Sequence, residues 1–292
     1  MRILYCASEA NPFCGSGGLA DVAGSLPHTL CRKGQDCRIV VPLYGTIPQD
    51  LKNQLNFITN FTVPVAWRHQ YCGLFWARWN DCTYYFIDNE YYFKRDKLYG
   101  FYDDAERFAF FSRAILEMLP HIDFHPDIIH TNDWQTALTV IYLKTEFAHH
   151  PALSGIKTVY TIHNIEYQGQ YGYQVLGDVF GISGNYMGVL EYDGCVNLMK
   201  GAIEMSDIVS TVSPSYAKEI KYSFYAHGLE DIIVRNEHKL HGILNGIDVD
   251  YYNPKTDKFL FANYSKTDME GKKICKAELQ KMLNLPVRKD VP

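Results

Sequence analysis

Short apolar runs alternate with longer segments of helical periodicity through most of the 292-residue chain. Buried parallel strands that are linked by crossover helices produce this alternation. The sequence therefore predicts an α/β fold with a doubly wound, mostly parallel sheet. The expected strands are residues 3–7, 37–41, 84–87, 127–130, 158–162, 208–212 and 240–244. The expected helices are residues 19–33, 104–119, 135–147, 197–205 and 214–222.

Two segments depart from this alternation. Residues 57–64 and 71–79 alternate aromatic with polar side chains and have no crossover helix between them, which predicts an antiparallel excursion near 57–79. The tail becomes richer in Lys and Asp, and residues 266–283 have the pattern of one amphipathic helix. We expect a large α/β domain over residues 1–255, followed by a linker and helix over 256–292.

Composition excludes several classes of protein. The chain has 28 Lys and Arg against 33 Asp and Glu, a net charge of -5, so no basic field predicts binding to nucleic acid or to an anionic membrane. No window approaches the ~18 apolar residues of a membrane span. The N-terminus has no long apolar region and no cleavage site of a signal peptide. The eight cysteines include no CxxC pair, which predicts free thiols, no zinc site and a cytoplasmic location.

A glycine-rich turn follows the first expected strand and leads into the first expected helix. It contains Gly15, Ser16, Gly17 and Gly18, and backbone N–H groups at a helix N-terminus suit a phosphate. The spacing also matches a dinucleotide fingerprint. Two observations oppose that alternative: about seven residues separate the strand from the glycines, and residues 41–43 at the end of the second strand include no acid for a ribose. A glycine turn without a ligand remains a third interpretation.

Hydrogen-bonding side chains follow later strands, and ligands of open α/β sheets bind beyond the carboxyl ends of strands. Asp133 and Trp134 pair a carboxylate with a flat aromatic face, a combination suited to a sugar. Core packing is the alternative for Trp134, and a purely structural role is the alternative for His163. Asn164 and Asn245 also lie at this edge. Other acids lie on helical faces and are expected to be solvated: Glu106, Glu117 and Glu219.

Seven segments together resemble one family. They are SEANPFCGSGGLADVAGSLP at 8–27, YDDAERFAFFSRAILE at 102–117, DIIHTNDWQTAL at 127–138, YTIHNIEYQG at 160–169, EYDGCVNLMKGAI at 191–203, DIVSTVSPSYAKEI at 207–220 and LNGIDVDYYNP at 244–254. In this order they resemble the bacterial glycogen synthase and starch synthase family, retaining glycosyltransferases of the GT-B fold. The resemblance implies a Rossmann-like N-terminal domain of such an enzyme.

The resemblance also implies a reaction and a set of residue roles. Family members transfer glucose from ADP-glucose to the non-reducing end of an α-1,4-glucan, with neither a metal nor another cofactor. The implied catalytic residues are His163, Asp21 and Asn245. The implied donor-binding residues are Gly15, Ser16, Gly17 and Gly18. The implied acceptor-binding residues are Glu9, Asp133, Trp134 and Asn164.

Two positions depart from the family pattern. Gly15 stands where the family usually has a lysine near the donor, and Gln135 stands where a histidine often follows Asp-Trp. The missing lysine leaves the preference for ADP-glucose or UDP-glucose open. It also leaves open a non-catalytic glucan-binding module of the same fold.

Family members have a second Rossmann-like domain beyond the length of this sequence. That domain supplies cationic side chains for the phosphates and completes the cleft. We therefore expect the 292 residues alone to transfer glucose poorly or not at all.

Overall fold

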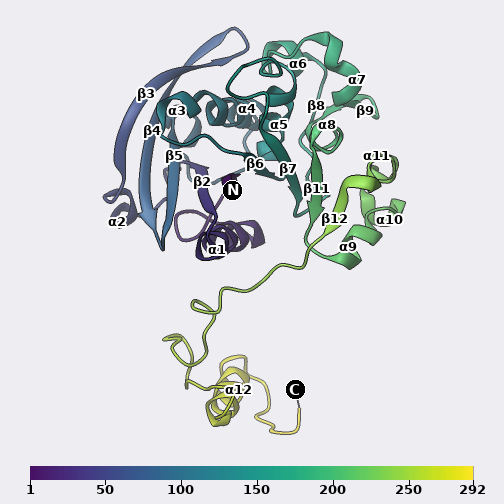
Figure 1. Ribbon diagram of the computed structural model, residues 1–292. Helices are drawn as coiled ribbons and strands as arrows, with labels where there is room; N and C mark the ends of the chain where they lie inside the picture. The colour runs from purple at the N-terminus through teal and green to yellow at the C-terminus, as the bar shows by residue number, and fades with distance from the viewer. Residues whose placement is uncertain (292) are drawn as a thin grey trace. The chain divides into compact units, whose positions relative to one another are not determined.

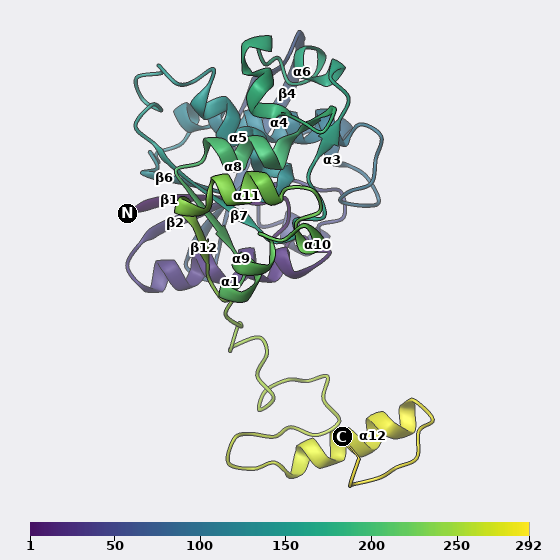
Figure 2. The same cartoon turned by 90° about the vertical axis from the view of Figure 1, so that its right-hand side faces the viewer.

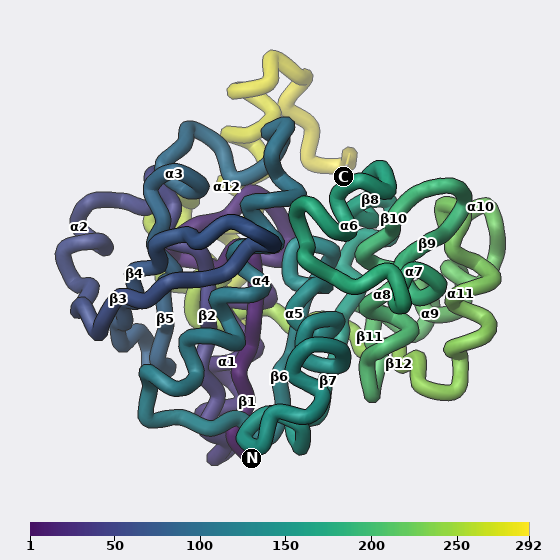
Figure 3. The backbone as a smooth tube through the Cα atoms, turned by 90° about the horizontal axis from the view of Figure 1, so that it is seen from above, coloured from purple at the N-terminus to yellow at the C-terminus, as the bar shows by residue number. Residues whose placement is uncertain are grey.

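A computed structural model describes residues 1–291. Unit 1, Met1–Asn245, is built around one large sheet. Its strands, from one edge to the other, are β12 (Leu240–Gly242), β11 (Ile208–Thr211), β7 (Lys157–Ile162), β6 (Ile128–Asn132), β1 (Arg2–Cys6), β2 (Asp36–Pro42), β5 (Cys82–Asp88), β4 (Arg68–Trp79) and β3 (Asn56–Val65). Figure 3 shows this order from β3 to β12.

Strands β12 to β5 pair in parallel, whereas β4 and β3 pair antiparallel. The mostly parallel sheet and the antiparallel excursion are thus confirmed. Every expected core strand is present, and the central ones are mostly buried apolar runs, whereas the edge strand β12 has no buried residue. Strand ends shift by a few residues, and β12 already ends at Gly242.

Helices cover both faces of the sheet. In Figures 1 and 2, α1 (Gly18–Arg32) and α9 (Pro214–Glu219) lie on one face, and α4 (Asp104–Glu117), α5 (Trp134–Lys144) and α8 (Leu198–Met205) lie on the other. The shorter helices are α2 (Gln49–Lys52), α3 (Glu90–Phe93), α6 (Gln174–Asp178), α7 (Met187–Leu190), α10 (Ser223–Ala226) and α11 (Glu230–Arg235). Three-residue 3-10 turns are η1 (Leu119–His121), η2 (Gly184–Tyr186) and η3 (Glu237–Lys239).

Side-chain chemistry explains individual helix ends. The Ser213 hydroxyl accepts a hydrogen bond from the backbone N–H of Tyr216, which caps α9 as its Ser-Pro start predicts. Helix α9 ends at Glu219 and α5 at Lys144, each earlier than expected from the sequence. Among the described helices, none is long and apolar enough to cross a membrane. All eight cysteines are free thiols, as predicted.

A small antiparallel sheet was not predicted. It lies in the long connection after β7 and consists of β8 (Gln170–Tyr171), β10 (Cys195–Asn197) and β9 (Glu191–Tyr192). Strands of two or three residues are too short to show a periodic pattern. Asp178 of this connection contacts the antiparallel excursion. It accepts hydrogen bonds from the indole N–H of Trp67 and from the guanidinium of Arg68.

Unit 2 begins at Gly246 and contains α12 (Glu270–Met282). This helix lies within the predicted range 266–283 but begins later. Residues Ser265 and Asp268 exchange backbone hydrogen bonds of 2.8 and 3.2 Å in a turn, so the chain cannot be helical there. Helix α12 is anchored to the preceding segment by the Cys275 thiol, which donates to the Ala262 carbonyl.

Candidate active site

Strand order brings the predicted site residues to one edge of the sheet. Strands β6, β1 and β2 are parallel neighbours, and β7 lies beside β6. The carboxyl ends of these strands therefore meet at the same edge. The glycine loop, residues 8–18, follows β1; Asp133 follows β6; His163 and Asn164 follow β7.

A buried carboxylate holds the glycine loop. Glu9 is only 4% exposed, and one of its oxygens accepts hydrogen bonds from both the backbone N–H and the hydroxyl of Ser16, at 2.6 and 2.7 Å. Burial raises the pKa of Glu9, while the bonds from Ser16 act in the opposite direction. Glu9 thus fixes the loop just before the N-terminus of α1, where Gly17 is the N-cap residue.

The glycines of this loop differ in the space around them. A Cβ at Gly15 would lie 2.7 Å from the Cβ of Ala20 and 2.8 Å from Oδ1 of Asn11, so no side chain fits there without movement. A Cβ at Gly18 would have nothing within 4 Å. Gly15 is therefore required by the packing of the loop itself. Gly18 leaves open space beside the first turn of α1, in which the N–H of Ala20 already donates to the Gly17 carbonyl at 3.1 Å.

Asp21 is exposed on the first turn of α1. Its Oδ1 accepts a hydrogen bond of 2.7 Å from the side-chain amide of Asn11. Its carboxylate stabilises the helix N-terminus, and the bond ties it to the loop in front of the helix. Asp21 therefore lies beside the glycine loop, at the carboxyl ends of the strands.

His163 is held by two consecutive residues at the end of β6. Its ring Nε2 lies 2.9 Å from Oδ1 of Asn132, and its backbone N–H donates to Oδ1 of Asp133 at 2.8 Å. Burial lowers the pKa of His163 to about 4, because the charged ring would lose its hydration. The imidazole is therefore neutral at physiological pH.

Asp133 occupies the N-cap position of α5 with an unusual backbone, φ 55° and ψ -177°, and its side chain makes no capping hydrogen bond to the helix. The same Oδ1 also receives the N–H of Asn164 at 3.4 Å. Burial raises the pKa of Asp133 to about 7, and the charge of Glu9 adds to this rise.

Trp134 is mainly a core residue. It is 9% exposed, and its ring lies 5.2 Å from the ring of Phe108 and 6.1 Å from that of Tyr171. Gly169 approaches so closely that a Cβ there would lie 2.8 Å from the indole. Core packing, one of the two interpretations from the sequence, is thus observed, and only a small part of the ring could touch a ligand.

The remaining predicted residues are exposed. Asn164 accepts a hydrogen bond from the N–H of Glu166 in a local turn. Asn245 is the last residue of unit 1, and among the described residues no hydrogen bond joins it to the other predicted site residues. The roles assigned to all these residues by resemblance remain predictions.

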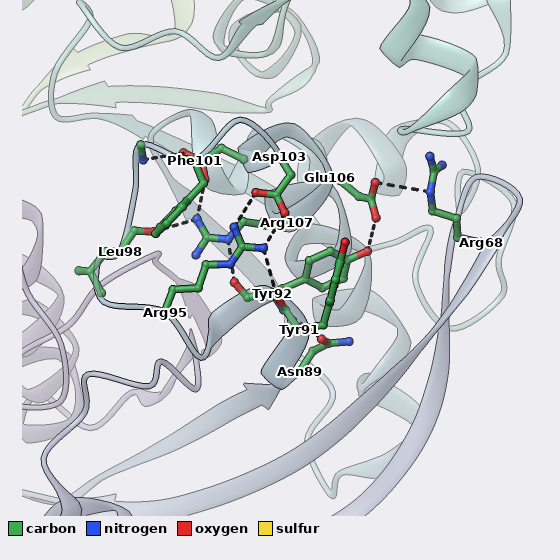
Figure 4. A network of polar contacts seen from close by, with 12 residues as sticks. Arg68, Asn89, Tyr91, Tyr92, Arg95, Leu98, Phe101, Asp103, Glu106 and Arg107 are labelled. Atoms are coloured by element: carbon green, nitrogen blue, oxygen red, sulfur yellow. Dashed lines mark hydrogen bonds and ion pairs between the residues drawn. The ribbon is translucent and has the colours of Figure 1, made fainter.

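A polar network beside the site was not anticipated (Figure 4). Arg107 is fully buried, pairs with Asp104 at 2.5 Å and donates to the backbone carbonyls of Tyr92 and Leu98. Glu106 was expected to be solvated, and this is wrong. It accepts a hydrogen bond from the Tyr92 hydroxyl and pairs with Arg68 of the excursion, which covers this face of α4.

Residues 2–235 match the family model of the starch synthase catalytic domain. The chain belongs to the glycogen synthase and starch synthase family. Its relatives include the glycogen synthase of Alkaliphilus metalliredigens, 50% identical over all of this chain and 62% of the relative. The glycogen synthase of Geobacillus stearothermophilus is 47% identical over all of this chain and 61% of the relative.

A solved structure of the same family has the same fold. The catalytic domain of starch synthase IV from Arabidopsis thaliana, bound to ADP and acarbose, matches with a TM-score of 0.88 and 33% identity, over 100% of this chain and 60% of that one. The family resemblance and the fold predicted from the sequence are thus confirmed. The present chain spans about 60% of the length of these starch and glycogen synthases.

Proposed function

We propose that this chain is the N-terminal half of a GT-B glucosyltransferase. The enzyme would transfer glucose from ADP-glucose to the non-reducing end of an α-1,4-glucan, with retention at the anomeric carbon. One observation carries the proposal: a helix N-terminus with an open glycine, suited to a diphosphate, shares one sheet edge with neutral hydrogen-bonding groups suited to a sugar. The family relatives named glycogen synthase support it.

The residues of this chain would act by positioning and by electrostatics. The N–H groups at the start of α1 would hold the diphosphate, with Glu9 keeping Ser16 and Gly17 in place. His163 would contact the transferred glucose. Asp133 would hold the backbone of His163 and Asn164 beside the acceptor. The proposed reaction uses no metal and no cofactor besides the nucleotide sugar.

We also propose that the 292 residues alone are a poor catalyst. The ionisable side chains described at this edge are acidic or neutral: Glu9, Asp21, Asp133 and His163. They do not offset the charge that develops on a leaving diphosphate. Cationic groups would have to come from the further length that the relatives possess. The free cysteines support a cytoplasmic location for the whole protein.

An elongation assay tests this function. The full-length protein that contains this chain and the 292-residue polypeptide are each incubated with ADP-glucose and a maltooligosaccharide. We expect the full-length protein to add α-1,4-linked glucose and the 292 residues to add little or none. Failure of the full-length protein to elongate the glucan, with maltooligosaccharide binding retained, would instead support the non-catalytic glucan-binding module.

A further inference from the structure

The side chain of Asn132, at the end of β6, has a fixed orientation. It is fully buried, and its Nδ2 donates to the carbonyl of Cys6 at 2.9 Å. Its Oδ1 receives the hydroxyl of Tyr5 at 2.9 Å. The Cys6 carbonyl can only accept, so it requires the amide nitrogen of Asn132 to face it, and the Tyr5 hydroxyl is free to donate to the oxygen that remains. The atom that faces the ring of His163 is therefore an acceptor.

This orientation determines the tautomer of His163. Nε2 of the ring lies 2.9 Å from Oδ1 of Asn132, so Nε2 must carry a hydrogen and donate it. A neutral imidazole has one N–H, and here that N–H is already used. The remaining nitrogen, Nδ1, has a lone pair and can only accept.

The surroundings keep the ring neutral. Burial lowers the pKa of His163 to about 4. The neighbouring His130 ring donates or accepts at Thr161, 2.6 Å away, and burial lowers the pKa of His130 to about 3. The carboxyl group of Asp133 contacts the backbone N–H of His163 rather than its ring.

We propose that Asn132 is a positioning residue that holds His163 in its Nε2–H tautomer, so that Nδ1 accepts a hydrogen bond from a hydroxyl of the donor glucose. This inference rests on the proposed function. It excludes a role for His163 as a cation toward the phosphates, because the ring has neither a charge nor a second N–H to offer. Asn132 would thus favour recognition of the sugar over recognition of the diphosphate.

Nitrogen-15 NMR of the full-length protein, with labelled histidine, tests the tautomer directly. The His163 signals are assigned by their loss in His163→Gln. We expect a protonated Nε2 and a bare Nδ1 from about pH 6 to 8, the range in which an ordinary histidine titrates. An imidazolium signal near neutral pH, or a dominant Nδ1–H tautomer, would overturn the proposal.

Two substitutions of Asn132 test its part in this arrangement. Asn132→Leu removes the acceptor, and we expect both tautomers of His163 to appear. Asn132→Asp keeps an acceptor oxygen, and its added charge should keep Nε2 protonated and move the His163 titration to higher pH. If the leucine variant does not fold, the aspartate variant decides: an unchanged His163 titration would overturn the proposal.

Tyr5→Phe is the matched control. It removes the other donor to the same oxygen of Asn132 but leaves the contact to His163. The His163 tautomer should stay as in the wild type, and kcat for glucose transfer should change by no more than about twofold. A shift of the tautomer in this variant to the mixture expected for Asn132→Leu would point to general loosening of the core.

Kinetics separates this inference from the proposed function. Asn132→Leu should lower kcat for transfer from ADP-glucose by about 100-fold, the usual effect of a misplaced reacting geometry. Binding of ADP, which has no glucose, should change by no more than about twofold. Equal losses for both ligands would overturn the inference. A wild-type protein that transfers no glucose would refute the proposed function instead, and the tautomer would still be measurable.

Discussion

The glycine loop and the β6–β7 edge lie at the same end of one sheet, yet they are built in opposite ways. In the glycine loop, Glu9 holds the backbone of Ser16, and the open space is beside Gly18 at the start of a helix. At the β6–β7 edge, the side chains of Asn132 and Asp133 hold the ring and the backbone of His163. The loop offers backbone donors, which suit an anion, and the edge offers a neutral acceptor, which suits a hydroxyl.

The two regions should respond differently to substitution. A change in the glycine loop should act on its local packing and on binding of a diphosphate. A change at the β6–β7 edge should act on the core and on the sugar, because Asn132 and Trp134 are buried and Asn132 contacts the ring of His163. Substitutions in each region test this difference.

The largest effect is expected from Trp134→Ala at the β6–β7 edge. Removing an indole that packs on Phe108 and Tyr171 should lower the free energy of unfolding by about 3–5 kcal/mol, as for other large-to-small core changes. Urea denaturation measures it. Tyr102→Ala is the control, because Tyr102 is 95% exposed and should change stability by no more than about 0.5 kcal/mol. Wild-type stability with lost glucan binding would show instead that Trp134 acts as a surface contact.

A smaller effect is expected from Gly15→Ala in the glycine loop. The added methyl would meet Ala20 and Asn11 at less than 3 Å, so the free energy of unfolding should fall by about 1–3 kcal/mol through overpacking. Gly18→Ala is the matched control. It meets nothing within 4 Å and should fold normally but weaken ADP-glucose binding, measured by calorimetry. Equal stability of the two variants would contradict the difference in packing.

Asp133→Asn should change the way in which stability depends on pH. The folded pKa of Asp133 is raised to about 7 from an ordinary 3.8, so the folded protein binds the proton more tightly than the unfolded chain. Stability must then fall as pH rises between about 4 and 7. Asparagine does not titrate, and its oxygen can still accept the N–H of His163. Between about pH 5 and 8 the variant should therefore gain about 2–3 kcal/mol relative to the wild type.

Urea denaturation at both pH values measures this difference. A difference in the free energy of unfolding between variant and wild type that does not change with pH would mean that Asp133 is ionised in the folded protein. A loss of stability of the variant relative to the wild type as pH rises would be opposite to the prediction.

Much of the fold could be predicted from the sequence because its signals are local. The core strands are short apolar runs, and the cap at Ser213 involves residues three positions apart. The contacts that define the site are not local. Asn132 bonds to Tyr5, 127 positions away, and to His163, 31 positions away. No spacing along the chain reveals such pairs.

Two side chains show how tertiary packing overrides local pattern. The helical position of Glu106 suggests exposure to solvent, but Arg68 from the excursion covers it and pairs with it. Trp134 follows a strand like a ligand-binding aromatic, but Gly169 and Phe108 surround its ring. In both cases the deciding neighbour comes from another element of the fold.

We propose that the glycine loop binds the diphosphate and that the β6–β7 edge binds the sugar. Binding of ADP and ADP-glucose to His163→Ala in the full-length protein tests this difference. Calorimetry measures both dissociation constants and those of Gly18→Ala. We predict that Gly18→Ala weakens both ligands, whereas His163→Ala weakens ADP-glucose and leaves ADP within about twofold of the wild type. Equal weakening of ADP and ADP-glucose by His163→Ala would show that His163 contacts the diphosphate rather than the sugar.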